Sequence, residues 1–155
     1  MNTNRSITVD LPTLTATEDL ARMYACLAEI GDVITLQGDL GTGKTTFARA
    51  FIQAWMQKSC QVPSPTFTLV QLYERKEQTL YHFDLYRLDS VLEVIELGLE
   101  EALHTGLTLI EWPERLEGMA LSNHLKLEFS FLSTQQSRKV VLTPDTKWQE
   151  RVILK

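Results

Sequence analysis

Residues 38–51, GDLGTGKTTFARAF, decide the fold of this chain. Gly38, Gly43, Lys44 and Thr45 occupy the fixed positions of the pattern G-x-x-x-x-G-K-[ST]. The glycines let backbone N–H groups turn toward phosphate oxygens, the lysine supplies a positive charge, and the threonine hydroxyl is a natural Mg²⁺ ligand. The stretch therefore predicts a phosphate-binding loop that opens a helix.

The segments on either side of the loop give it the required context. Residues 32–37, DVITLQ, are rich in β-branched side chains and predict a strand that runs directly into the loop. Phe47, Phe51 and Trp55 follow at helical spacing and predict a helix with one buried face. Strand, loop and helix in this order indicate that the match is not accidental.

Farther upstream, the sequence predicts one more strand and one more helix. Residues 6–11, SITVDL, alternate in polarity as a half-buried strand does. Thr15 and Glu18 form a capping-box pattern, so we expect a helix from Thr15 toward Glu29.

The rest of the chain favours strands, with short helices between them. Ser90 and Glu93 form a second capping box, whose helix is interrupted at Gly98, and residues 100–104 offer another helical turn. Prolines 63 and 65 make residues 62–67 an ordered loop. β-Branched or alternating runs predict strands at 67–74, 79–88, 107–112, 124–132, 138–144 and 150–155.

This order of elements predicts an α/β fold in one domain spanning residues 1–155. Helices between strands favour a central sheet that is mostly parallel, and the hairpins favour antiparallel strands at its edges. Together with the phosphate loop, the pattern indicates a three-layer fold like that of P-loop nucleoside triphosphatases.

The amino-acid composition argues against several classes of function. The formal net charge of −5 and the pI of about 5.2 argue against a protein that binds DNA or RNA through a basic face of its own. No apolar run approaches membrane-spanning length, and we expect a cytoplasmic protein with no membrane partner. Cys26 and Cys60 predict buried or inert thiols, and neither the cysteines nor the three histidines have the spacing of zinc ligands.

Three residues are candidates to complete a hydrolase. Glu111 ends the apolar run LTLIE, and a carboxylate at the tip of a core strand lies where α/β sheets bind ligands. Asp84 shares one strand face with His82 and Tyr86, and the alternative is that this face is simply turned to solvent. Thr66 resembles the metal-side hydroxyl of switch loops, but a threonine among prolines is also typical of a simple turn.

Missing motifs are also informative. An N-K-x-D segment that would recognise guanine is absent, which favours ATP over GTP. A lid rich in arginine is absent, which weakens the interpretation as a small-molecule kinase. Arg87 is the only arginine predicted within a candidate site, and the alternative is that it is a surface residue.

Four motifs, GDLGTGKTTFAR, PSPTFTLV, YHFDLYRL and LIEWPER, occur in this order and spacing. Together they resemble the TsaE family, over about residues 15–115. Its members are small bacterial ATPases needed for threonylcarbamoyladenosine modification of tRNAs that read codons beginning with adenine. Thr42 is a departure, because alanine is usual there in this family.

The resemblance implies a role for each matching residue. Thr45 and Glu111 would hold Mg²⁺, the cofactor, and Lys44, Thr66 and Asp84 would act on ATP, the substrate. The residues expected to contact ATP are Leu14, Thr15, Gly41, Thr42, Gly43, Lys44, Thr45, Thr46 and Trp112.

The resemblance also implies partners. Such proteins hydrolyse ATP weakly alone and act with the TsaD and TsaB subunits, so tRNA is met only through that complex. Two alternatives remain open: a stand-alone phosphotransferase for a small metabolite, and a binding protein gated by nucleotide, whose hydrolysis is incidental.

Overall fold

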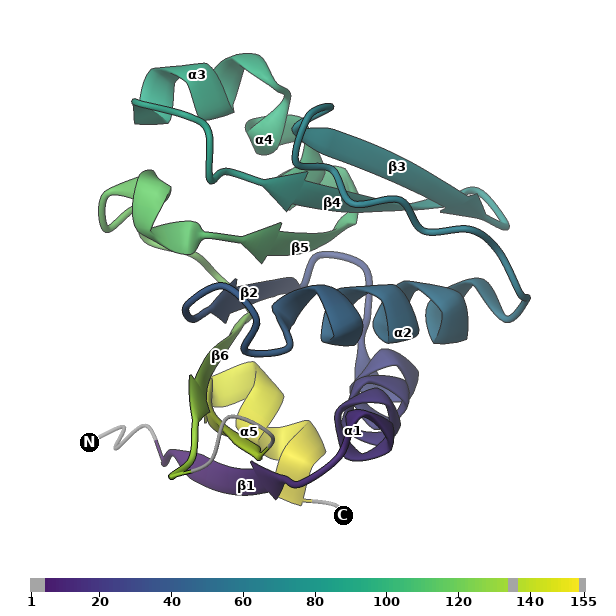
Figure 1. Cartoon of the computed structure of the whole chain (residues 1–155). Helices are drawn as coiled ribbons and strands as arrows, with labels where there is room; N and C mark the ends of the chain where they lie inside the picture. Colours follow the sequence, from purple (N-terminus) through teal and green to yellow (C-terminus); the bar gives the residue numbers. More distant parts are fainter. Residues whose placement is uncertain (1–4, 134–136, 154–155) are drawn as a thin grey trace.

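One sheet of seven strands runs through the protein in the order β1-β7-β6-β2-β5-β4-β3 (Figure 1). The computed structural model describes residues 5–133 and 137–153. β6, β2, β5 and β4 are parallel, whereas β7, β1 and β3 pair antiparallel toward the edges. The strands are β1 (Ile7–Leu11), β2 (Val33–Gln37), β3 (Val70–Arg75), β4 (Gln78–Asp84), β5 (Leu107–Glu111), β6 (His124–Phe131) and β7 (Arg138–Pro144).

Helices cover both faces of the sheet, so the predicted α/β fold with a mixed sheet is confirmed. Leu109 and Ile110 of β5 are both buried, but they belong to separate hydrophobic clusters on opposite faces. Figure 1 shows α3 and α4 at the top, away from α1 and α2. The helices are α1 (Leu14–Leu27), α2 (Lys44–Met56), α3 (Val91–Glu96), α4 (Leu99–Thr105), the 3₁₀ helix η1 (Pro113–Leu116) and α5 (Thr146–Ile153).

The predicted strand at 150–155 is wrong. Its described part belongs to α5, and residues 154–155 lie outside the described residues. Asp145 caps this helix, because its Oδ1 accepts a hydrogen bond from the backbone N–H of Trp148. Trp148 and Val152, four residues apart, both pack against the core on the side of α1. Helical spacing of these apolar side chains therefore overrides the β-branched character of Val152 and Ile153.

The predicted capping boxes differ in detail from the structure. Thr13, not Thr15, caps α1, because its hydroxyl accepts a hydrogen bond from the Ala16 N–H at 3.1 Å. Ser90 stands at the N-cap of α3 without a side-chain bond to the helix. Instead, the Glu93 carboxylate accepts from the Asp89 N–H at 2.9 Å. The helices exist as predicted, but α1 begins one residue earlier and ends at Leu27.

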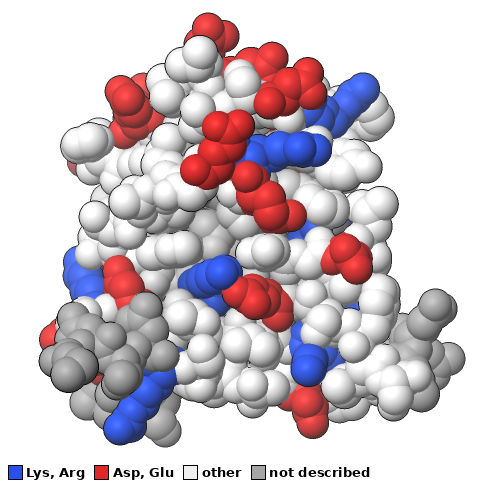
Figure 2. Space-filling view, turned by 90° about the vertical axis from the view of Figure 1, so that its left-hand side faces the viewer, with Lys and Arg blue, Asp and Glu red and all other residues white. Residues whose placement is uncertain are grey.

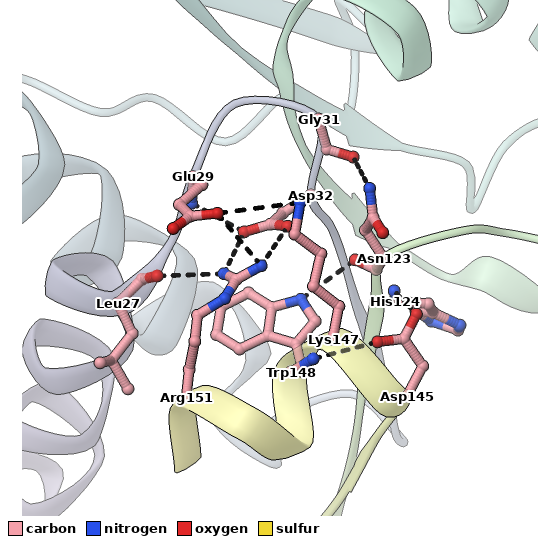
Figure 3. A network of polar contacts seen from close by, with 10 residues as sticks. All are labelled: Leu27, Glu29, Gly31, Asp32, Asn123, His124, Asp145, Lys147, Trp148 and Arg151. Atoms are coloured by element: carbon pink, nitrogen blue, oxygen red, sulfur yellow. Dashed lines mark hydrogen bonds and ion pairs between the residues drawn. The ribbon is translucent and has the colours of Figure 1, made fainter. Parts of the chain in front are cut away.

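A polar network attaches α5 to the turn between α1 and β2 (Figure 3). Arg151 donates two hydrogen bonds to the carboxylate of Asp32, one of them 2.8 Å long, and a third to the carbonyl oxygen of Leu27. The hydrogen bond to Asp32 raises the pKa of the Arg151 guanidinium above its ordinary value. The last helix is thereby fixed to the start of the central strand β2, which leads into the phosphate loop.

Candidate functional site

The carboxyl ends of β2, β4 and β5 meet around a cavity of about 410 Å³, a volume typical of small-ligand sites. The register of the sheet places Glu111 beside Leu36 of β2 and Asp84 of β4. The residues that line the cavity are Leu14, Leu40, Gly41, Gly43, Lys44, Thr45, Thr46, Thr66, Asp84, Tyr86, Glu111, Trp112 and Arg138.

The loop that follows β2 depends on glycine at two positions. Gly43 has φ 109° and stands at the N-cap of α2, a conformation that side chains other than glycine's rarely adopt. Gly38 has φ 149°, and a Cβ atom there would lie 2.5 Å from the carbonyl oxygen of Phe129 on β6. The loop is therefore set directly against β6, with the N-terminus of α2 facing the cavity.

Lys44 lies folded back in this structure. Its ammonium donates a hydrogen bond to the carbonyl of Gly38, and its Nζ lies 3.3 Å from the centroid of the Trp112 ring. Burial lowers the pKa of this ammonium, although the negative charge of Glu111 opposes the effect. Trp112 has φ 61°, a conformation that is strained for an aromatic residue and is typical of functional sites.

Glu111 is a buried carboxylate with few partners. It is 2% exposed. The hydroxyl of Thr45 donates to its Oε1 at the long distance of 3.3 Å, and the Nε2 of His82 lies 2.8 Å from its Oε2. Thr45 and Glu111 are thus adjacent, which is the arrangement that two ligands of one cation would need.

Asp84 is held by two donors. The hydroxyl of Thr66 lies 3.0 Å from Oδ2, and the N–H of Tyr86 donates to Oδ1 at 3.0 Å. The alternative that this strand face is turned to solvent is wrong for His82 and Asp84, which are buried because α2 covers their side of the sheet. Tyr86 lies beyond the end of β4 and packs against the ring of Trp112.

Two of the predicted ATP contacts do not line the cavity. Thr15 is exposed on α1. Thr42 is buried, and its hydroxyl is turned to the carbonyl of Asp39 at 2.6 Å. The other predicted site residues are all among the lining residues.

Arg138 was missed by sequence reasoning. Its Nε donates to the carbonyl of Gly41 at 2.9 Å, so the prediction that Arg87 is the only arginine in the site is wrong. Arg87 is exposed and lies over the ring of Phe67, outside the cavity lining. Only the pairing of β7 with β6 brings Arg138 to the loop, and no local sequence pattern carries that information.

Comparison with known proteins shows the family of the chain. Residues 11–140 match the family described as "Threonylcarbamoyl adenosine biosynthesis protein TsaE". The chain belongs to the TsaE family. Similar proteins named "tRNA threonylcarbamoyladenosine biosynthesis protein TsaE" occur in Rickettsia felis, at 38% identity over 82% of this chain and 74% of the relative. One from Bacillus subtilis is 39% identical over 72% of this chain and 69% of the relative.

A solved structure shares the fold. The crystal structure of YdiB from Bacillus subtilis superimposes with a TM-score of 0.80 at 26% identity. The match covers 99% of this chain and 95% of that one. The architecture of this TsaE-family chain, including the strands beyond β5, is therefore also found in an experimental structure.

The residues around the cavity of this TsaE-family chain fit a cation that is held only in part by protein. Among residues 5–133 and 137–153 there is no group of three or more His, Cys, Asp or Glu side chains that could hold a metal. Mg²⁺ does not require one, because it is commonly bound through one or two protein oxygens together with water and substrate phosphates. The Thr45 hydroxyl and the Glu111 carboxylate, which has few partners of its own, are oxygen ligands of that kind.

The face that carries the site shows no continuous basic patch in Figure 2, within the described part of the chain. Acidic side chains gather in the upper part of this view, and the basic ones are scattered among acidic neighbours. No described helix has the length and apolar character needed to cross a membrane.

Proposed function

We propose that this protein is a Mg²⁺-dependent ATPase that acts in the threonylcarbamoyladenosine modification of tRNA. The observation that carries the proposal is the convergence of Lys44, Thr45, Asp84 and Glu111 on the cavity beside the N-terminus of α2. Membership of the TsaE family supplies the pathway. The chemistry follows from what each side chain can do at its place.

Binding of ATP begins at the glycine loop. Its N–H groups and those at the N-terminus of α2 would donate hydrogen bonds to the phosphates, and Lys44 would leave the Gly38 carbonyl and the Trp112 ring to meet their negative charge. When bound, Mg²⁺ would supply charge neutralisation on the phosphates. Thr45 and Glu111 would hold it, since their oxygens already face each other.

Asp84 is the residue that we assign to the attacking water. Its carboxylate is oriented by Thr66 and by the N–H of Tyr86, so it presents a fixed acceptor in the lining of the cavity. Such an acceptor can orient a water molecule toward the terminal phosphate. Thr66 lies in the loop before β3, so a shift of that loop would change the position of Asp84.

The partners that we propose are the TsaD and TsaB subunits, with tRNA reached through their complex. The acidic composition and the scattered basic side chains in Figure 2 support a protein that does not bind tRNA alone. Slow hydrolysis by the isolated protein, stimulated by the complex, is the expected behaviour.

The test is phosphate release from Mg·ATP by the purified protein, alone and then with TsaD, TsaB and tRNA. We expect slow release alone and faster release with the partners. Fast release that does not depend on the partners, or transfer of phosphate to an added metabolite, would overturn the proposal and favour a small-molecule kinase.

A second comparison separates hydrolysis from nucleotide-gated binding. Glu111→Ala should still bind the partners but should fail to support tRNA modification if ATP turnover is required. Modification that survives in this variant without hydrolysis would show that nucleotide binding alone is the signal.

A further inference from the structure

We infer that His82 is a positioning residue, which holds the Glu111 carboxylate in the orientation that the cation requires. The inference rests on the proposed Mg·ATP site and adds a residue to it. His82 does not line the cavity and matches no part of the phosphate loop. It acts only through Glu111.

The contact joins two side chains that are both removed from water. His82 is 1% exposed and Glu111 is 2% exposed, and His82 Nε2 lies 2.8 Å from Glu111 Oε2. The other carboxylate oxygen, Oε1, accepts from the Thr45 hydroxyl at 3.3 Å. The two oxygens are therefore held from two elements, β4 and the start of α2, and His82 makes the shorter bond.

The nitrogen of His82 that has no hydrogen-bond partner bears on which ring nitrogen carries the proton in the neutral imidazole. Among the described residues, the buried Nδ1 has no hydrogen-bond partner. A ring with its proton on Nε2 donates to Glu111 and leaves only a lone pair on Nδ1, which is less costly to bury than an unpaired N–H. In this tautomer the imidazole orients the carboxylate without cancelling its negative charge.

A neutral donor suits a carboxylate that must remain available to a cation. An arginine or lysine in the same place would neutralise Glu111 and compete with the metal. Groups that hydrogen-bond to metal-ligating side chains fix their orientation, and mutation of such groups typically lowers metal affinity about 10–100-fold. His82 has the contact and the burial that this role requires.

The variants are chosen to separate orientation from packing. His82→Gln can place an amide N–H near the position of Nε2, whereas the shorter His82→Asn cannot, and His82→Leu removes the donor. Thr108→Val is the matched control, because Thr108 is buried in the neighbouring strand and no hydrogen bond to its hydroxyl exists among the described residues. Its side chain faces away from Glu111, since the two are three positions apart on β5.

The measurement is binding of a fluorescent ADP analogue, titrated with free Mg²⁺ and repeated in EDTA. We expect His82→Leu and His82→Asn to raise the Mg²⁺ concentration for half-maximal effect about tenfold or more. His82→Gln and Thr108→Val should stay close to the wild-type protein, and nucleotide affinity in EDTA should not change in any of them. Thermal unfolding without nucleotide checks that each variant is folded.

Each outcome decides the inference. If His82→Leu does not fold, the comparison of His82→Asn with His82→Gln still distinguishes a missing donor from a changed volume. Equal Mg²⁺ dependence in Asn and Gln variants, or no change in a folded Leu variant, would overturn it. Glu111→Gln is measured in parallel. If this variant leaves the Mg²⁺ dependence unchanged, the proposed metal site itself is wrong. If Glu111→Gln changes the Mg²⁺ dependence and the His82 variants do not, the metal site stands and only the role of His82 is wrong.

Discussion

Asp32 and Glu111 are both buried carboxylates at the ends of sheet strands, yet their surroundings are opposite. Asp32 is 0% exposed and receives two hydrogen bonds from Arg151 and one from the N–H of Glu29. Glu111 pairs with His82 and Thr45, and among the described residues it forms no ion pair with lysine or arginine. Lys44, which shares its cavity, donates instead to the carbonyl of Gly38.

The difference distinguishes a charge that is compensated within the fold from one that we propose to be functional. Asp32 lies before β2, at the end of the strand remote from the phosphate loop, and its charge is fully compensated within the fold. Glu111 lies at the loop end of β5, where compensation is left incomplete. A buried charge without a permanent counterion is unfavourable for folding but creates affinity for a cation. The comparison predicts opposite consequences of mutation at the two sites.

The largest effect on stability is expected from Arg151→Met. It leaves Asp32 buried without its counterion, so the free energy of unfolding should fall by about 3–5 kcal/mol, measured by urea denaturation. Adding Asp32→Asn should recover most of the loss, because the amide oxygen still accepts from Glu29. Arg22→Met is the control: its ion pairs with Glu18 and Asp19 are exposed, and its cost should not exceed about 1 kcal/mol. Equal costs for the two arginines would contradict the comparison.

Glu111→Gln should affect activity strongly and stability little, in contrast to Arg151→Met. Loss of a carboxylate that holds the cation should slow ATP hydrolysis about 100-fold, a typical effect for an electrostatic group in an active site. The free energy of unfolding without nucleotide should stay the same or rise, because a buried charge has been removed. Phosphate release and urea denaturation of the same preparation measure both effects. A strongly destabilised variant would show that Glu111 is also structural.

Thr66→Val tests whether the orientation of the Asp84 carboxylate affects the rate of ATP hydrolysis. The variant loses the hydroxyl that donates to Asp84, a bond to a charged group worth about 1.5–3 kcal/mol, so hydrolysis should slow by roughly tenfold or more. Affinity for ATP should change little, since the glycine loop is intact. Thr68→Val, an exposed change in the same segment, is the control. A loss of ATP affinity without a change in the rate of hydrolysis would place Thr66 in binding instead.

The smallest effect is expected in the pH dependence of stability, through His124 in the polar network around α5. Burial lowers the pKa of His124, which bonds to Thr35; Asp145 partly opposes the shift, and Lys126 adds to it. The unfolded chain therefore takes up a proton near pH 6.5 and the folded protein only at lower pH. Stability should be complete above pH 6.5 and should fall as the pH decreases toward the lowered pKa.

Denaturation of His124→Gln between pH 5 and 7.5 measures this contribution. The variant should show a shallower fall than the wild-type protein. His104→Gln, an exposed change on α4, is the control and should keep the original fall. An unchanged slope in His124→Gln would show that the proton is taken up elsewhere.

The sequence could predict what depends on neighbours along the chain. The phosphate loop, the strand end at Glu111 and the buried face of α2 follow from short patterns, and the structure has them. The opposite nature of the two carboxylates could not be predicted, because Arg151 meets Asp32 across 119 positions of sequence. His82 was placed on the correct strand face, but the alternation does not reveal which face α2 covers. Arg138 reaches Gly41 only through strand pairing.

The Asp32–Arg151 pair has a consequence for the order in which the protein is made. A ribosome adds about 5–20 residues per second, so the 119 positions between the two residues take roughly 6–24 s to synthesise. During that interval the strand that leads into the phosphate loop already exists, but the guanidinium that neutralises its first carboxylate does not. The nascent chain therefore cannot compensate the buried charge of Asp32 until the last helix, α5, has been made.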